Sequence, residues 1–135
     1  MKFLHTMLRV KDLEKSLNFY CNVLDFKLIA KDDFKDGEFT LAFIQAPSDN
    51  GDGSMLELTY NWGVSSYEMG TAYGHVAFEV ENIFDFQKKL QKHGYDLSWG
   101  PKKSPSGLRY IAFMVDPDGY KIELLEPRPA NASFS

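Results

Sequence analysis

Two histidines and two glutamates occupy matched positions in two similar halves of the chain. His75 lies 70 residues after His5, and each opens a β-prone run. Glu123 lies 66 residues after Glu57, and each stands between Leu or Ile neighbours. Two imidazoles and two carboxylates suit a borderline divalent ion such as Ni²⁺, Co²⁺, Zn²⁺ or Mn²⁺. The set therefore predicts a metal centre that leaves coordination positions open for water or substrate.

Each of these residues alone has a simpler interpretation as a surface or hydrogen-bonded polar group. Their coincidence in a repeat favours the metal interpretation. Glu123 adds a second reason, because it lies between Ile122 and Leu124. A carboxylate in so apolar a strand must face water, a cation or a metal, since burying it unpaired is costly.

Two further polar residues share the faces of these ligands. Arg9 is four residues after His5, and Asn61 is four residues after Glu57. On a strand this spacing keeps the side chain on the same face, ~13 Å further along. A guanidinium and an amide there suit the far end of an extended, charged ligand. The alternative is a surface arginine and a turn asparagine.

The elements that must position these residues follow from periodicity in the first half. Residues 5–10 alternate and predict a strand, with His5 and Arg9 on one face and Leu8 on the other. A helix is predicted to begin after Asp12, with an apolar face of Leu13, Leu17, Tyr20 and Leu24. Further strands are predicted at residues 26–29, 39–46 and 55–61, with a loop or turn at 31–38 and a hairpin loop at 47–54.

The second half repeats this order. Asn82 matches the N-cap Asp12, and the helix that follows is expected to end near Gly94. Residues 116–119, Asp-Pro-Asp-Gly, separate two apolar runs and predict a hairpin turn. Each half is thus strand–helix–strand–strand–strand, joined by a link at residues 62–73. Residues 127–135 are expected to form a loose C-terminal tail.

Composition limits the function classes. The chain has 135 residues, 44% of them hydrophobic, which is enough for one domain of two small repeats with a real core. The net charge of −4 gives no indication of a nucleic-acid-binding surface. Cys21 is the single cysteine, so an intrachain disulfide is excluded and a reducing compartment is indicated. No apolar run reaches the ~20 residues of a membrane span. The expected location is the cytoplasm, with no membrane partner.

Five motifs resemble the glyoxalase I (lactoylglutathione lyase) family of the vicinal oxygen chelate superfamily. They are HTMLRV at 5–10, LNFY at 17–20, ELTYNWG at 57–63, GTAYGH at 70–75 and DPDGYKIE at 116–123. Together they cover nearly the whole chain, from residue 1 to about 126. The short chain is similar to the bacterial type of the family.

The resemblance implies an α+β fold of two βαβββ repeats, at about 1–61 and 74–126, within a single domain of residues 1–126. It also implies a homodimer whose active sites lie at the interface, with two metal ligands from each subunit. The implied ligands are His5, Glu57, His75 and Glu123. The implied cofactor is one divalent ion per site, Ni²⁺ or Co²⁺ in preference to Zn²⁺.

The family reaction converts the hemithioacetal of methylglyoxal and glutathione to S-D-lactoylglutathione through a metal-stabilised enediolate. By resemblance, Glu123 is the better candidate for the base that shuttles the proton, and Glu57 is its counterpart in the repeat. The implied substrate contacts are Arg9 and Asn61 at the γ-glutamyl end, Arg109 at the glycyl carboxylate, and His75 beside the metal.

Two other classes of function fit the same fold. One is a different enzyme of the superfamily, such as an Fe²⁺ dioxygenase or a thiol transferase that acts on an antibiotic. Such enzymes use two histidines and one glutamate, so the second glutamate of this chain favours glyoxalase. The other is a metal-free antibiotic-binding module, which has no need of ligands in both halves.

Overall fold

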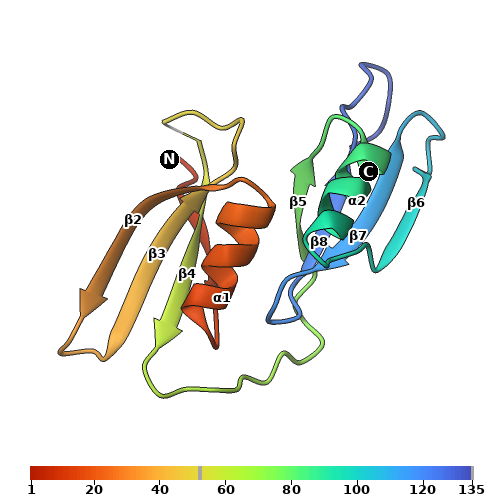
Figure 1. Cartoon of the computed structure of the whole chain (residues 1–135). Helices are drawn as coiled ribbons and strands as arrows, with labels where there is room; N and C mark the ends of the chain where they lie inside the picture. The colour runs from red at the N-terminus through yellow and green to blue at the C-terminus, as the bar shows by residue number, and fades with distance from the viewer. Residues whose placement is uncertain (52, 135) are drawn as a thin grey trace. The chain divides into compact units, whose positions relative to one another are not determined.

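The computed structural model describes residues 1–51 and 53–134. The chain forms two compact units, Met1–Gly70 and Thr71–Ser135. Each unit has one four-stranded mixed sheet with one helical segment packed on it (Figure 1). The predicted α+β architecture of two βαβββ repeats is therefore confirmed.

The first unit has strand order β1-β4-β3-β2. Its elements are β1 (His5–Arg9), α1 (Leu13–Leu17), the π-helix η1 (Asn18–Val23), β2 (Lys27–Phe34), β3 (Phe39–Gln45) and β4 (Met55–Asn61). β1 pairs with β4 in parallel, and the other neighbours are antiparallel. A parallel pair needs a long crossover connection, and here the helix and the two intervening strands supply it.

The second unit repeats this topology with strand order β5-β8-β7-β6. Its elements are β5 (His75–Glu79), α2 (Ile83–Lys92), β6 (Trp99–Lys103), β7 (Tyr110–Val115) and β8 (Lys121–Leu125). β5 and β8 are the parallel pair. β6 is the strand that the repeat requires between the second helix and residue 111.

Alternation along the strands divides each sheet into a core face and a more open face. In β4, Leu56 and Leu58 are buried while Glu57 between them is not. In β8, Ile122 and Leu124 are buried in the same way on either side of Glu123. Because successive side chains point to opposite faces, both glutamates stand on the face away from this core. The buried apolar residues of the strands and helices supply the main stabilisation of each unit.

The predicted helix starts are confirmed. The Asp12 side chain accepts a hydrogen bond from the backbone N–H of Lys15 at 3.0 Å. Asn82 caps α2 identically, with the Asp85 N–H at 3.0 Å. Each cap satisfies a backbone donor that the first helical turn leaves without a partner. Gly94 follows the end of α2 with φ +81°, as expected of a residue that terminates a helix in the left-handed region.

The predicted first helix is α-helical only as far as Leu17 and continues as the π-helix η1. Phe19 and Tyr20 are both fully buried, and their rings meet edge to face at 5.0 Å. The wider π-turn explains this departure, because it lets two consecutive aromatic side chains reach the core.

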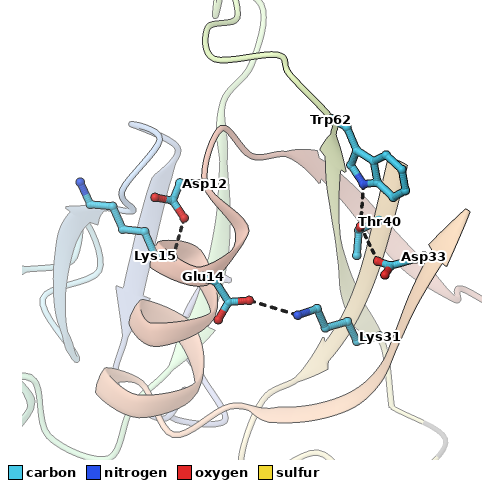
Figure 2. A network of polar contacts seen from close by, with 7 residues as sticks. All are labelled: Asp12, Glu14, Lys15, Lys31, Asp33, Thr40 and Trp62. Atoms are coloured by element: carbon cyan, nitrogen blue, oxygen red, sulfur yellow. Dashed lines mark hydrogen bonds and ion pairs between the residues drawn. The ribbon is translucent and has the colours of Figure 1, made fainter. Parts of the chain in front are cut away.

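The prediction of a loop or turn at residues 31–38 is wrong for its first half. β2 extends to Phe34, which pairs with Phe39 across a short turn, and the two rings stack at 4.8 Å. The charged residues of this stretch belong to an edge strand, where charge discourages pairing with another chain. Lys31 reaches Glu14 of α1 at 3.1 Å (Figure 2). This pair is exposed and contributes little to stability.

The predicted hairpin turn between β7 and β8 is confirmed. The side chain of Asp116 accepts hydrogen bonds from the backbone N–H groups of Asp118 and Tyr120, both at 2.9 Å. Gly119 has φ +92° and donates its N–H to the Asp116 carbonyl at 3.0 Å. The turn fixes the register of β8 and thereby the face on which Glu123 stands.

Within the described residues, no helix is both long and apolar enough to span a membrane.

Candidate active site

The first histidine–glutamate pair lies on the open face of the first unit. His5 is in register with Met55, so Glu57 stands two residues further along the neighbouring strand, diagonally across from His5. His5 Nε2 lies 3.2 Å from Glu57 Oε2. The His5 side chain is 35% exposed and that of Glu57 is 13% exposed. The pair is thus accessible through the imidazole while the carboxylate is largely enclosed.

The second pair has the same geometry in the second unit. His75 is in register with Lys121, and Glu123 again lies two residues further along. His75 Nε2 lies 3.1 Å from Glu123 Oε2, with side-chain exposures of 41% and 13%. The strand register that places the histidine diagonally across from the glutamate is therefore the same in both units. The relative position of the histidine Nε2 and the glutamate Oε2 is repeated with it.

A phenylalanine supports each histidine ring. Phe43 pairs with Glu57 in register and meets the His5 ring edge to face, with centroids 5.4 Å apart and an angle of 78°. Phe113 pairs with Glu123 and meets the His75 ring at the same distance and angle. The phenyl ring limits the rotation of the imidazole, so Nε2 remains aimed at the carboxylate.

The donor set fits a divalent ion. Two ligand atoms each about 2.1 Å from one ion, at angles between octahedral and tetrahedral, are ~3.0–3.4 Å apart. Both nitrogen–oxygen distances, 3.2 and 3.1 Å, fall in this range. Throughout the part of the chain that the structure describes, no group of three or more His, Cys, Asp or Glu residues is placed to hold an ion. Each unit thus offers two donors, half of a four-ligand set.

A pocket of about 570 Å³ adjoins the histidine of the second unit. Its lining comprises Tyr73, Gly74, His75, Ser98, Trp99, Phe113, Val115 and Lys121. Burial, with a smaller contribution from the charge of Asp116, raises the pKa of Tyr73 above its ordinary value. The sequence analysis did not identify Tyr73 and Trp99 as residues that line this pocket. The sequence shows only that each is an aromatic residue at or near the start of a strand.

The structure brings Arg9 and Asn61 to one end of the first unit's open face. Arg9 is in register with Thr59, so Asn61 lies two residues further along β4. This is the same diagonal that relates His5 to Glu57, displaced by four residues. The Asn61 side chain donates from Nδ2 to the hydroxyl of Tyr67 at 3.0 Å. Sequence reasoning did not identify Tyr67, because the link that contains it has no periodicity.

Arg109 is placed differently from the other predicted substrate contacts. It is 5% exposed, and its guanidinium donates to the Glu126 carbonyl at 3.1 Å and to the carbonyls of Ser133 and Phe134. Its Nε is buried and has no hydrogen-bond partner among the described residues. The guanidinium therefore holds the C-terminal segment, and its role as a substrate contact stays a prediction.

The C-terminal tail is not loose as predicted. Ala132 is buried, and its carbonyl accepts a hydrogen bond from Arg128 at 2.6 Å. The Arg128 guanidinium also lies over the Phe134 ring, 4.4 Å from the centroid. These contacts, with those of Arg109, were beyond prediction because they join residues far apart in the sequence or lack a periodic pattern.

Comparison with known proteins identifies the family. The model of the Glyoxalase/Bleomycin resistance protein/Dioxygenase superfamily matches residues 2–124. The chain belongs to this superfamily. A superfamily relative named lactoylglutathione lyase, from Neisseria meningitidis serogroup A, is 45% identical over 137 residues, covering 100% of this chain and 97% of the relative.

Two solved structures of superfamily members share the fold. Glyoxalase I from Zea mays has a TM-score of 0.86 at 32% identity, and the match covers 95% of this chain but 45% of the maize chain. The trypanothione-dependent glyoxalase I of Leishmania major has a TM-score of 0.79 at 40% identity, covering 93% of this chain and 86% of that chain. This superfamily member therefore has the length of the Neisseria relative and spans about half of the maize chain.

Superfamily membership alone does not specify an activity, because one fold can host many unrelated reactions. The activity must therefore be inferred from the residues on the open faces of the two sheets. In this member of the superfamily they are two His–Glu pairs of equal geometry, with an arginine and an asparagine further along the first unit.

Proposed function

We propose that this protein is a lactoylglutathione lyase that isomerises the hemithioacetal of methylglyoxal and glutathione to S-D-lactoylglutathione. The observation that carries the proposal is the repetition of one His–Glu geometry in both units, at 3.2 and 3.1 Å. The relative at 45% identity that bears this enzyme name supports it. The physiological role would be detoxification of methylglyoxal in the cytoplasm, and the single cysteine fits a reducing compartment.

The proposed cofactor is one divalent ion held by His5, Glu57, His75 and Glu123. Such an ion, when bound, supplies positive charge that stabilises a negative charge developing on substrate oxygens. Ni²⁺ or Co²⁺ is proposed in preference to Zn²⁺, on the resemblance to short bacterial chains. We also propose a homodimer in which each site takes two ligands from each subunit, a scheme supported by the single His–Glu pair that the described residues of each unit provide.

Glu123 is the proposed base. The reaction moves a proton between two adjacent carbons, from the one that carries hydroxyl and sulfur to its oxidised neighbour. A carboxylate that is only 13% exposed keeps bulk water away from the proton it holds, so the same proton can be returned. Ile122 and Leu124 are buried on the opposite face of β8, and this burial holds Glu123 on the open face. Glu57 has the same setting and is the alternative base.

Substrate recognition is proposed to rest on Arg9 and Asn61 for the γ-glutamyl end, with His75 beside the reacting atoms. Arg109 is proposed for the glycyl carboxylate, but its guanidinium would first have to exchange the tail carbonyls for the ligand. An ionised carboxylate is a stronger acceptor than a neutral carbonyl, which would offset part of the lost tail contacts.

The deciding experiment is reconstitution. The purified protein is stripped of metal, reloaded separately with Ni²⁺, Co²⁺ and Zn²⁺, and assayed by the ultraviolet absorbance of the thioester product. Activity with the glutathione hemithioacetal, highest with Ni²⁺ or Co²⁺, is the expected outcome. A parallel assay with the trypanothione hemithioacetal tests thiol choice. Thioester formation that is absent with every metal and both thiols would refute the proposal.

A further inference from the structure

The end of β4 carries a polar corner that includes a residue of the link between the units. Asn61 is the last residue of β4, and its carbonyl accepts a hydrogen bond from the Val64 N–H at 3.1 Å. Gly63, at φ +78°, allows this tight turn. The chain then returns far enough for the Tyr67 hydroxyl to lie 3.0 Å from Asn61 Nδ2.

The turn is anchored on the opposite side of the sheet. The Trp62 indole donates from Nε1 to the Thr40 hydroxyl at 2.8 Å, and Thr40 in turn donates to Asp33 at 2.7 Å (Figure 2). The Trp62 backbone N–H donates to the Glu38 carbonyl at 2.8 Å. The corner therefore stands on a strand end that Trp62 anchors, and the position of the Asn61 backbone does not depend on the link beyond Trp62.

Tyr67 is distinguished from its neighbours by burial. It is half-buried, whereas residues 63–66 and 68–70 are all exposed. Within residues 63–70, which are otherwise exposed to solvent, Tyr67 is thus the one side chain that packs against the sheet. That side chain ends at the amide proposed to bind substrate.

The contact determines which atom of the amide is available. Nδ2 donates one of its two hydrogens to the Tyr67 hydroxyl and is thereby fixed, and the amide oxygen Oδ1 has no hydrogen-bond partner in the described part of the chain. A phenol that accepts a hydrogen bond still has its own proton to donate. The corner therefore presents an acceptor, Asn61 Oδ1, and a donor, Tyr67 O–H, beside the second Nδ2 hydrogen and on the same face as Arg9.

We propose that Tyr67 is a specificity-determining residue that makes this corner select a zwitterionic α-amino acid head group. The inference rests on the proposed function, whose substrate carries such a group on its γ-glutamyl residue. Tyr67 fixes the Asn61 amide so that Oδ1 accepts from the ligand ammonium. Its own hydroxyl donates to the ligand carboxylate beside Arg9. A phenol and a guanidinium then share the carboxylate, and the amide oxygen pairs with the ammonium.

The test measures binding without turnover. Metal-loaded full-length protein is titrated calorimetrically with S-hexylglutathione and with the same conjugate acetylated on its γ-glutamyl amine. The parent should favour the free amine. Tyr67→Phe keeps the ring and removes the hydroxyl, so its affinity for the free amine should fall by about 10-fold or more, as for loss of a hydrogen bond to a charged group. Affinity for the acetylated conjugate should fall less, because this ligand loses the hydroxyl contact to its carboxylate but has no ammonium to pair with the oriented Asn61 amide oxygen. The preference for the free amine should therefore narrow.

Tyr60→Phe is the matched control, because Tyr60 precedes Asn61 in β4 and faces the other side of the sheet. It should leave both affinities unchanged. In an Asn61→Ala background, Tyr67→Phe should still lower both affinities, because the hydroxyl contact to the ligand carboxylate is lost, but it should no longer change the ratio of the two affinities, since no Asn61 amide remains to be oriented. If Tyr67→Phe binds each conjugate as tightly as the parent does, the proposed role of Tyr67 is overturned. Failure of the parent itself to bind S-hexylglutathione would instead count against the proposed function.

Discussion

The two units carry the same pair of polar side chains in nearly the same geometry. His5 lies 3.2 Å from Glu57, and His75 lies 3.1 Å from Glu123. In both units a phenylalanine ring stands 5.4 Å from the histidine ring at 78°. Two stretches of sequence with different neighbours and different hairpin loops thus produce one arrangement, as expected if both serve one metal.

Four residues further along the same strands, the units differ. The first unit has Arg9 and Asn61, and the equivalent positions of the second unit are Glu79 and Pro127. A guanidinium and an amide can bind an anionic head group, whereas a carboxylate and a proline ring cannot. The repeat is therefore symmetric at the proposed metal ligands and asymmetric at the proposed contacts to an unsymmetrical substrate.

The largest effect should come from removing either histidine. His5→Ala and His75→Ala should each lose metal affinity by more than the ~10–100-fold typical of residues that only support a ligand, and activity should vanish with the metal. Mass spectrometry of the native protein measures the metal content. If one of the two histidine variants retains full metal content and activity while the other variant loses both, the two units are not equivalent as proposed.

Next in size is the replacement of one carboxylate. Glu123→Gln keeps the shape of the side chain but removes the base, so kcat at saturating metal should fall by about 10²–10⁴-fold. Glu57→Gln should cost less if it is only a ligand. Stopped assays on both variants, each with its metal content determined, separate the roles. Turnover of fully loaded Glu123→Gln within about threefold of the parent would transfer the role of base to Glu57.

A smaller effect is expected at the asymmetric positions. Arg9→Ala removes a charge-assisted contact and should raise KM by about 10-fold or more, with metal content unchanged. Glu79→Ala, at the equivalent position of the second unit, is the control and should leave KM close to that of the parent. Steady-state kinetics with the hemithioacetal decide the matter, and a loss of metal at unchanged KM in Arg9→Ala contradicts the assignment.

The smallest effect on catalysis is expected at Arg109. Arg109→Met removes the hydrogen bonds to the tail and should lower the free energy of unfolding by about 1–3 kcal/mol. Thermal denaturation measures this loss. Arg128→Met is the control, because Arg128 is exposed and should matter less. A KM that also rises in Arg109→Met would support the proposed contact of Arg109 with the glycyl carboxylate, and an unchanged KM would contradict it.

Sequence reasoning reached the symmetric part of the molecule because symmetry itself was the signal. The match of His5 with His75, and of Glu57 with Glu123, predicted one set of four ligands. The strand register brings a histidine and a glutamate within 3.2 Å in each unit, and the joint set of four stays a prediction. Helix caps and the hairpin turn were predictable because their determinants are local: Asp12, Asn82 and the run of residues 116–119.

The features that were missed depend on contacts between distant residues. Phe34 belongs to a strand because it pairs with Phe39, although the charges before it are typical of a loop. Tyr67 meets Asn61 only because the chain turns at Gly63. The tail is held by Arg109, which is remote from residues 133 and 134 in sequence. Propensity and periodicity describe neighbours along the chain, so they carry no information about such contacts.

The hairpin loops of the two units differ in length by four residues, yet the geometry that follows them is the same. The connection between β3 and β4 is therefore longer than its counterpart in the second unit, and this additional length does not disturb the position of Glu57. Residues 47–50 are exposed. A fluorescent peptide label placed there should report on the protein in living cells while leaving both chain ends unmodified, which matters because the C-terminal segment packs against Arg109.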